Sequence, residues 1–222
     1  MKLVHPAFTQ QLQLTPCTAC QLVLEPPELL ANCVQELYRQ TEGAEGQFVL
    51  SNGEKELDIA KNVTTVLNPF AVDLQERKIV TKLYHELESL AYGEELYLAT
   101  RELQLQLQQY FFQLEHSSPY LLTNHAEADF TALLKAMGVQ LENTADDFVE
   151  QLALYLDIQA SLLGKKLAVL VQVSSYLTPA QMQQLQEMAA YREIALLWIE
   201  NQQKDFAIEH TCYIIDKDYC EI

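Results

Sequence analysis

Positive charge is scarce in this sequence. Its 222 residues include 14 lysines and arginines against 31 aspartates and glutamates, so the formal net charge is −17. Affinity for a phosphate backbone comes mainly from lysine and arginine. The charge balance therefore argues against a protein that binds nucleic acid through a generally basic surface.

Long apolar runs are also missing. No segment approaches the ~18–20 apolar residues of a membrane-spanning helix, and the opening MKLVHPAFTQ lacks the apolar stretch and cleavage site of a secretory signal. Hydrophobic residues still make up 49% of the chain, which suffices for a buried core. We therefore expect an acidic, globular, cytoplasmic protein with no membrane partner and with its five cysteines as free thiols.

Glycine is rare as well, with six in the whole chain. Neither G-x-x-x-x-G-K-[ST] nor G-x-G-x-x-G occurs, so the sequence has no loop that would wrap phosphates. The catalytic patterns G-x-S-x-G and H-E-x-x-H are also absent. These absences argue against a nucleotide hydrolase, and we expect no enzyme activity.

Apolar strands and helices alternate at both ends of the chain. A helix follows Pro26 and Pro27, and Thr178-Pro179 is typical of another helix start. Strand, helix and strand in this order predict a mostly parallel sheet with helices on its faces. The predicted strands are residues 19–25, 47–50, 63–67, 166–173, 194–200 and 212–215.

The middle of the chain has helical periodicity instead. Asp73 with Glu76 suggests a capping box, and a near-heptad apolar stripe follows Gly93, which predicts an antiparallel helical hairpin. The stripe consists of Leu96, Leu103, Leu107, Tyr110 and Leu114. The fold class is therefore α/β, with a head made of residues 1–72 and 164–222 and an inserted α-helical leg of residues 73–163.

Two groups of residues are candidates for binding. Arg77, Lys78 and Lys82 fall on one predicted helix, where Lys78 and Lys82 lie one turn apart. Ordinary solubilising charge is the alternative interpretation of this group. Glu127 and Asp129 are candidate ligands of a hard cation, although calcium takes six to eight oxygens; an acid-rich helix start is the alternative. Further basic candidates are Arg101, Lys135, Lys165 and Lys166.

Three stretches carry a resemblance to a known family. They are VTTVLNPFAVDLQERKIVTKLYHELE, FTALLKAMGVQLENTADDFVEQLALYLDIQASLLGKKLAVLVQVSSYLTPAQMQQLQEM and the closing IALLWIE with CYIIDKDY. In content and order they resemble the CRISPR-associated Csn-two family, an accessory protein of type II-A spacer acquisition. The resemblance rests on the order of segments, because no catalytic motif contributes to it.

The resemblance implies a specific function. It implies a head similar to a nucleotide-binding fold without its phosphate loop, and a helical leg. It also implies a non-catalytic homotetrameric ring that binds double-stranded DNA ends without sequence preference, with calcium as support. The implied partners are the integrase pair and the effector nuclease of the CRISPR system. Lys82 matches a lysine of the corresponding family helix.

One departure from the family concerns calcium. Family members carry a dense acidic cluster before a short helix, whereas this chain has His116-Ser117-Ser118-Pro119-Tyr120 at that position. Only Glu127 and Asp129 align with the acidic cluster, so we expect weak or partial calcium binding. The alternative function is an acidic protein-interaction scaffold of the adaptation complex with little direct DNA binding.

Overall fold

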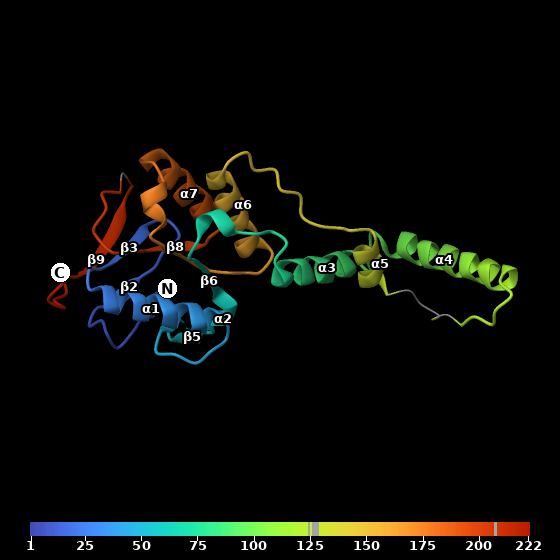
Figure 1. Cartoon of the computed structure of the whole chain (residues 1–222), viewed down its shortest axis with the longest axis horizontal. Helices are drawn as coiled ribbons and strands as arrows, with labels where there is room; N and C mark the ends of the chain where they lie inside the picture. Colours follow the sequence, from blue (N-terminus) through green and yellow to red (C-terminus); the bar gives the residue numbers. More distant parts are fainter. Residues whose placement is uncertain (124, 126–128, 207) are drawn as a thin grey trace. The chain divides into compact units, whose positions relative to one another are not determined.

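The computed structural model describes residues 1–123, 125, 129–206 and 208–222. The chain forms two compact units (Figure 1). The head unit consists of Met1–Leu74 and Asn143–Ile222, and the leg unit consists of Gln75–Glu142. The predicted α/β class is confirmed. Among the described residues, no helix is long and apolar enough to cross a membrane.

A five-stranded parallel sheet forms the centre of the head. Its order is β6 (Val63–Val66), β7 (Leu167–Val171), β8 (Ala195–Glu200), β3 (Ala19–Leu24) and β9 (His210–Ile215). Every residue of β3 and β8 is buried, as expected for central strands that are covered on both faces. Their sequences are apolar except for Gln21 in β3 and Glu200 at the end of β8, and this lack of alternation has the same cause.

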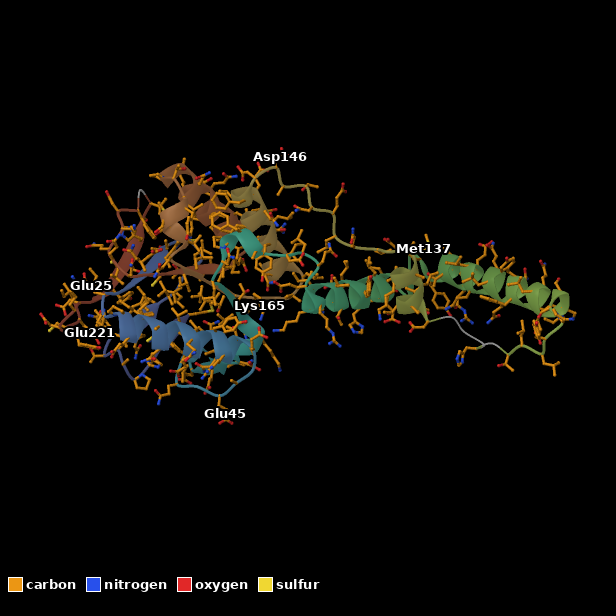
Figure 2. The ribbon with its side chains drawn as sticks, viewed as in Figure 1. Glu25, Glu45, Met137, Asp146, Lys165 and Glu221 are labelled. Atoms are coloured by element: carbon orange, nitrogen blue, oxygen red, sulfur yellow. The ribbon has the colours of Figure 1, made fainter. Side chains whose placement is uncertain are left out.

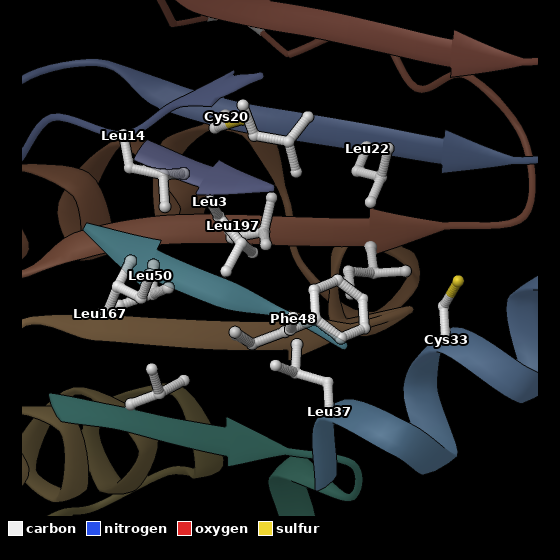
Figure 3. Close-up of a cluster of buried hydrophobic side chains, with 14 of the residues drawn as sticks. Leu3, Leu14, Cys20, Leu22, Cys33, Leu37, Phe48, Leu50, Leu167 and Leu197 are labelled. Atoms are coloured by element: carbon white, nitrogen blue, oxygen red, sulfur yellow. The ribbon is translucent and has the colours of Figure 1, made fainter. Parts of the chain in front are cut away.

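Helices cover both faces of this sheet (Figure 1). Helix α1 (Pro27–Thr41) packs Cys33 and Leu37 against Cys20 and Leu22 of β3 in one apolar cluster (Figure 3). Helices α6 (Phe148–Ser161) and α7 (Pro179–Tyr191) cover the opposite face. The start of α7 follows the prediction, because Thr178 and Gln181 form a reciprocal capping box with Pro179 in the first turn.

A smaller antiparallel sheet completes the apolar cluster around α1. Its order is β2 (Leu12–Gln13), β1 (Lys2–Val4), β4 (Val49–Asn52) and β5 (Lys55–Leu57), with helix α2 (Ile59–Asn62) following β5. Leu3, Leu12 and Leu50 are fully buried in the same cluster as Leu167 and Leu197 of the large sheet (Figure 3). Sequence periodicity predicted only the strand near β4, because two- and three-residue strands leave no measurable alternation.

The leg contains α3 (Arg77–Ala91), α4 (Tyr97–Ser117) and α5 (Phe130–Ala136). The Tyr84 hydroxyl donates to the Val139 carbonyl at 3.0 Å, which ties the segment after α5 to α3. The predicted hairpin of α3 and α4 is wrong, since α4 continues beyond the end of α3 (Figure 1). The Tyr97 amide donates to the Gly93 carbonyl at 2.9 Å, so helical bonding resumes immediately and the chain does not reverse.

Two predicted boundaries need correction. Helix α3 begins at Arg77 after the N-cap Glu76, and no side-chain cap is recorded there within the described chain, so the capping box at Asp73 does not form. The leg ends at Glu142 and not at residue 163. Helix α6 belongs to the head because Val149, Leu152 and Leu156 are buried there, and because Gln151 Nε2 donates to the Val72 carbonyl at 3.0 Å.

Glu200 is a buried acid at the carboxyl end of β8. It is 0% exposed, and its Oε1 accepts a long hydrogen bond from the Ser174 amide at 3.4 Å. Its Oε2 and the Ser174 hydroxyl have no hydrogen-bond partner within the described residues. Burial raises the pKa of Glu200, and the hydrogen bond from the Ser174 amide and the charge of Lys204 offset only part of this rise.

The raised pKa predicts a pH-dependent cost to stability. Between the pKa of Glu200 in the unfolded chain and its higher pKa in the folded protein, the folded state binds more protons than the unfolded state. The free energy of unfolding therefore falls as pH rises through this interval. Glu200→Gln should therefore match the unmodified protein below about pH 4 and exceed its melting temperature increasingly as pH rises. Thermal unfolding measured at a series of pH values from below pH 4 upwards checks the result, with exposed Glu54→Gln as control. Parallel profiles for Glu200→Gln and the unmodified protein would contradict it.

Candidate nucleic-acid interface

The N-terminal half of α3 carries the three basic residues that the sequence grouped. Arg77 and Lys78 occupy its first turn, and Lys82 lies one turn after Lys78; all three side chains are exposed. Ile79 and Tyr84 of the same helix are buried, which fixes the rotation of the helix. The basic face of α3, meaning Arg77, Lys78 and Lys82, is therefore presented to solvent.

The charges on α3 run against its dipole. A helix N-terminus carries partial positive charge, so acids stabilise the first turn and bases stabilise the last turn. Helix α3 has no acid among the residues of its first turn and no base in its last, while Glu86 and Glu88 lie in its second half. Each misplaced cation costs about 0.3–1 kcal/mol. Because helix stability does not account for this pattern, it favours a role in binding anions.

Lys82 has an acidic neighbour that a stronger anion can replace. Its Nζ lies 3.9 Å from Glu86 Oε1, and both side chains are 49% exposed. Exposed ion pairs at this spacing contribute only a few tenths of a kcal/mol. A phosphate could compete with Glu86 for Lys82 at little cost in folding stability.

Arg101 and Lys135 also belong to the leg but lie on other helices. Arg101 Nη1 donates to Gln104 Oε1 at 3.2 Å on α4, and Gln104 Nε2 in turn donates to the Tyr92 hydroxyl at 3.0 Å. Lys135 is exposed in the last turn of α5, where a cation suits the helix dipole. Local contacts thus account for both residues without a ligand.

Lys165 has a structural role that the sequence did not indicate. Its Nζ donates to the carbonyls of Ala60 at 2.6 Å and Val63 at 3.0 Å, and both hydrogen bonds are partly buried in the head (Figure 2). These carbonyls lie at the end of α2, where backbone acceptors lack helical partners. Adjacent Lys166 has an exposed side chain, so Lys166 is the better DNA candidate of this pair.

The two predicted calcium ligands have different outcomes. Asp129 Oδ1 accepts from the Ala132 amide at 3.2 Å and caps α5, as the alternative interpretation held. Glu127 lies outside the described residues. The described part of the chain contains no group of three or more histidine, cysteine, aspartate or glutamate residues that could hold a metal ion. Asp129 alone does not fit a calcium site of six to eight oxygens within one chain.

The fold and the basic helix together define a class of protein. It has a parallel α/β head, a sequence without a phosphate loop, and an inserted helical leg that bears a basic face. A family model described as CRISPR-associated protein (Cas_Csn2) matches residues 40–219. The chain therefore belongs to the CRISPR-associated Csn2 family, the family that its sequence resembles.

Individual relatives agree with this assignment. The CRISPR-associated protein Csn2 of Enterococcus faecalis is 26% identical over 87 residues, which is 39% of this chain and 38% of that protein. The match thus spans well under two thirds of that relative. The crystal structure of Stu0660 of Streptococcus thermophilus has a TM-score of 0.59 at 12% identity, covering 91% of this chain and 70% of the other. This similarity shows a shared fold.

The contacts of Lys165 predict a loss of stability when it is replaced. Lys165→Met should lower the free energy of unfolding by about 1–3 kcal/mol, because two partly buried carbonyls lose their donor. Lys166→Met is the matched control and should stay within about 0.5 kcal/mol of the unmodified protein. Denaturant unfolding measures both. A Lys165→Met variant that is fully stable but binds DNA more weakly would assign this ammonium to the DNA instead.

Proposed function

We propose that this protein is a non-catalytic DNA-binding component of CRISPR spacer acquisition in the cytoplasm. In this proposal it forms a homotetrameric ring and binds double-stranded DNA, preferably at ends and without sequence preference. Its partners are the integrase pair and the effector nuclease. Membership of the Csn2 family supports the CRISPR context. The observation that carries DNA binding is the basic face of α3.

The basic face suits binding without sequence preference. Arg77, Lys78 and Lys82 extend from the start of a helix whose own dipole adds positive potential. Cations of this kind contact phosphate oxygens, which fix position on a duplex but carry no base information. Symmetry repeats the basic face in every copy of an oligomer, and a lined channel focuses local potential even when the whole chain is acidic.

Helix α4 supports assembly. Leu103, Tyr110 and Leu114 follow a heptad spacing and are 41%, 57% and 41% exposed. Leu105 and Phe112 on another side of the helix are 57% and 60% exposed. A helix that is apolar on more than one side is typically buried among neighbours. The apolar surface of α4 is therefore available to other copies of the chain.

Calcium has a minor role in this proposal. Asp129 caps α5, and the family's acidic cluster is replaced at residues 116–120. We therefore propose that the ion binds weakly and that apolar contacts along α4 hold the ring. The alternative function, an acidic interaction scaffold with little DNA binding, is supported by three aromatic side chains that cluster on the head, Phe70, Phe148 and Tyr176.

The basic face predicts how DNA binding depends on salt. Combining Lys78→Ala with Lys82→Ala should weaken duplex binding equally for different sequences. It should also reduce the slope of log K against log salt by ~0.9 for each lost phosphate contact. The melting temperature should not fall, because the changes remove cations from a helix N-terminus. A salt titration with linear duplex measures the slope, with Lys55→Ala plus Lys61→Ala as a matched control on the head.

Closed circular duplex gives a second readout. A ring that threads DNA should bind the linear form and not the covalently closed circle. Unchanged affinity and unchanged salt slope in an intact assembly would remove α3 from the interface. Equal binding of circle and linear duplex would contradict threading, and failure to bind either would favour the scaffold function.

The α4 surface predicts the assembly state. The unmodified protein should scatter light as a particle of about four times the chain mass of 25.4 kDa, with little change on adding calcium. Leu103→Gln with Leu114→Gln should shift the mass towards smaller species, whereas Tyr191→Gln on the head should not. A strict monomer at micromolar concentration would refute the ring, and an unchanged mass in the α4 variant would place the interface elsewhere.

A further inference from the structure

Three aromatic side chains meet at the carboxyl edge of the large sheet. Phe70 lies in η1 (Pro69–Ala71) after β6, Tyr176 lies in η2 (Val173–Tyr176) after β7, and Phe148 begins α6. The Phe70 ring centroid is 5.0 Å from that of Phe148 and 5.0 Å from that of Tyr176, edge-on to the tyrosine. We call these three residues the aromatic cluster.

The aromatic cluster is exposed although its backbone is firmly held. Phe70 and Tyr176 are 56% and 52% exposed, and Phe148 is half-buried. The Asn68 side chain accepts from the Phe70 amide at 3.0 Å, and Gln151 Nε2 holds the Val72 carbonyl at 3.0 Å. Large rings grouped at the surface mark an interaction site more often than single ones do. A fixed backbone also lowers the entropy cost of binding.

The segments that build the aromatic cluster contain acids and lack cations of their own. The three segments that build it, residues 63–74, 143–161 and 167–191, contain not one lysine or arginine. Asp147 caps α6 by accepting from the Val149 and Glu150 amides. Glu150 Oε2 accepts from the Asp146 amide at 2.9 Å, and Asp146 lies at the surface of the head (Figure 2). Carboxylates therefore lie within a turn of Phe148.

This charge decides between the possible occupants. Exposed rings could stack on nucleobases, but such sites combine aromatics with cations that hold the backbone, and these segments have none. Pairing with the same surface of a second copy would bring two acidic rims together, which is unfavourable. The guanidinium group of arginine suits both the exposed rings and the acidic rim, since it stacks on aromatic rings and pairs with carboxylates.

We propose that the aromatic cluster and its acidic rim are a docking surface for an arginine-bearing, partly apolar segment of a partner protein. Arginine side chains lie over Phe70 and Tyr176 and reach Asp146 and Glu150, while apolar side chains cover Phe148. The surface selects arginine over lysine, because the ammonium group is more strongly hydrated and cannot stack. This docking surface does not depend on DNA binding by α3 and goes beyond the proposed function.

The test uses the full-length protein and defined peptides. The probe is a fluorescent twelve-residue peptide that alternates arginine with leucine, compared with the lysine–leucine peptide of equal charge. We expect the arginine peptide to bind more tightly. Phe70→Ala with Tyr176→Ala should weaken its binding by about tenfold or more. The matched control is Tyr191→Ala, which removes an 80% exposed ring of α7 and should leave binding unchanged.

Two further measurements cover the other occupants. Duplex binding and the mass in solution are measured for the same variants, and both should stay unchanged. Equal binding of the arginine peptide by the double variant and the unmodified protein would overturn the proposal. A double variant that loses DNA affinity would make the cluster a nucleic-acid surface, and one that dissociates would make it a subunit interface; either result also overturns it. Loss of α3-dependent DNA binding alone leaves the peptide result intact, so the two proposals fail separately.

Discussion

Burial of the central parallel sheet on both faces is the constraint on which the rest of the molecule depends. All six residues of β8 and all six of its neighbour β3 are buried, and four of the five residues of β7 are buried as well. Such strands must be covered by a layer on each side. Helix α1 and the small antiparallel sheet provide one layer, and α6 with α7 provides the other. The carboxyl edge of the sheet is left as the place where loops and helix starts gather, and both Glu200 and the aromatic cluster lie there.

This constraint explains which elements could be predicted from sequence. Strands β3, β7 and β8 read as continuous apolar runs because no face of the sheet meets water, and the Thr178-Pro179 start of α7 is encoded by neighbouring residues. Strands β1, β2 and β5 were missed because they are only two or three residues long and leave no measurable alternation. Helix α6 has clear helical periodicity in its apolar residues, but periodicity does not show whether the helix packs in the head or in the leg. The hairpin of α3 and α4 failed for a related reason: Gly93 permits a reversal without requiring one.

The candidate interface also contains residues that local sequence could predict and residues that depend on distant contacts. Arg77 precedes Lys78 on the same helix, and Lys78 and Lys82 were predictable as a pair because helical spacing brings them to one face. The role of Lys165 was not, since its acceptors, the Ala60 and Val63 carbonyls, lie about a hundred residues away in sequence. Asp129 was a candidate ligand by composition, yet the local helix start uses its carboxylate as a cap. The aromatic cluster combines residues from three separate segments, so no sequence window contained it.

A net charge of −17 is compatible with two proposed binding surfaces of opposite charge, the basic face of α3 and the acidic rim of the aromatic cluster, because the charges are segregated along the chain. Cations are concentrated at the start of α3, against the preference of the helix dipole. The segments that build the aromatic cluster carry acids and no lysine or arginine. In the two proposals, a phosphate backbone is repelled by the acidic rim of the aromatic cluster and attracted to the basic face, while an arginine-rich protein segment has the reverse preference. Under the two proposals, this segregation of charge would let one acidic chain hold DNA and a basic partner at once, without either ligand competing for the surface of the other.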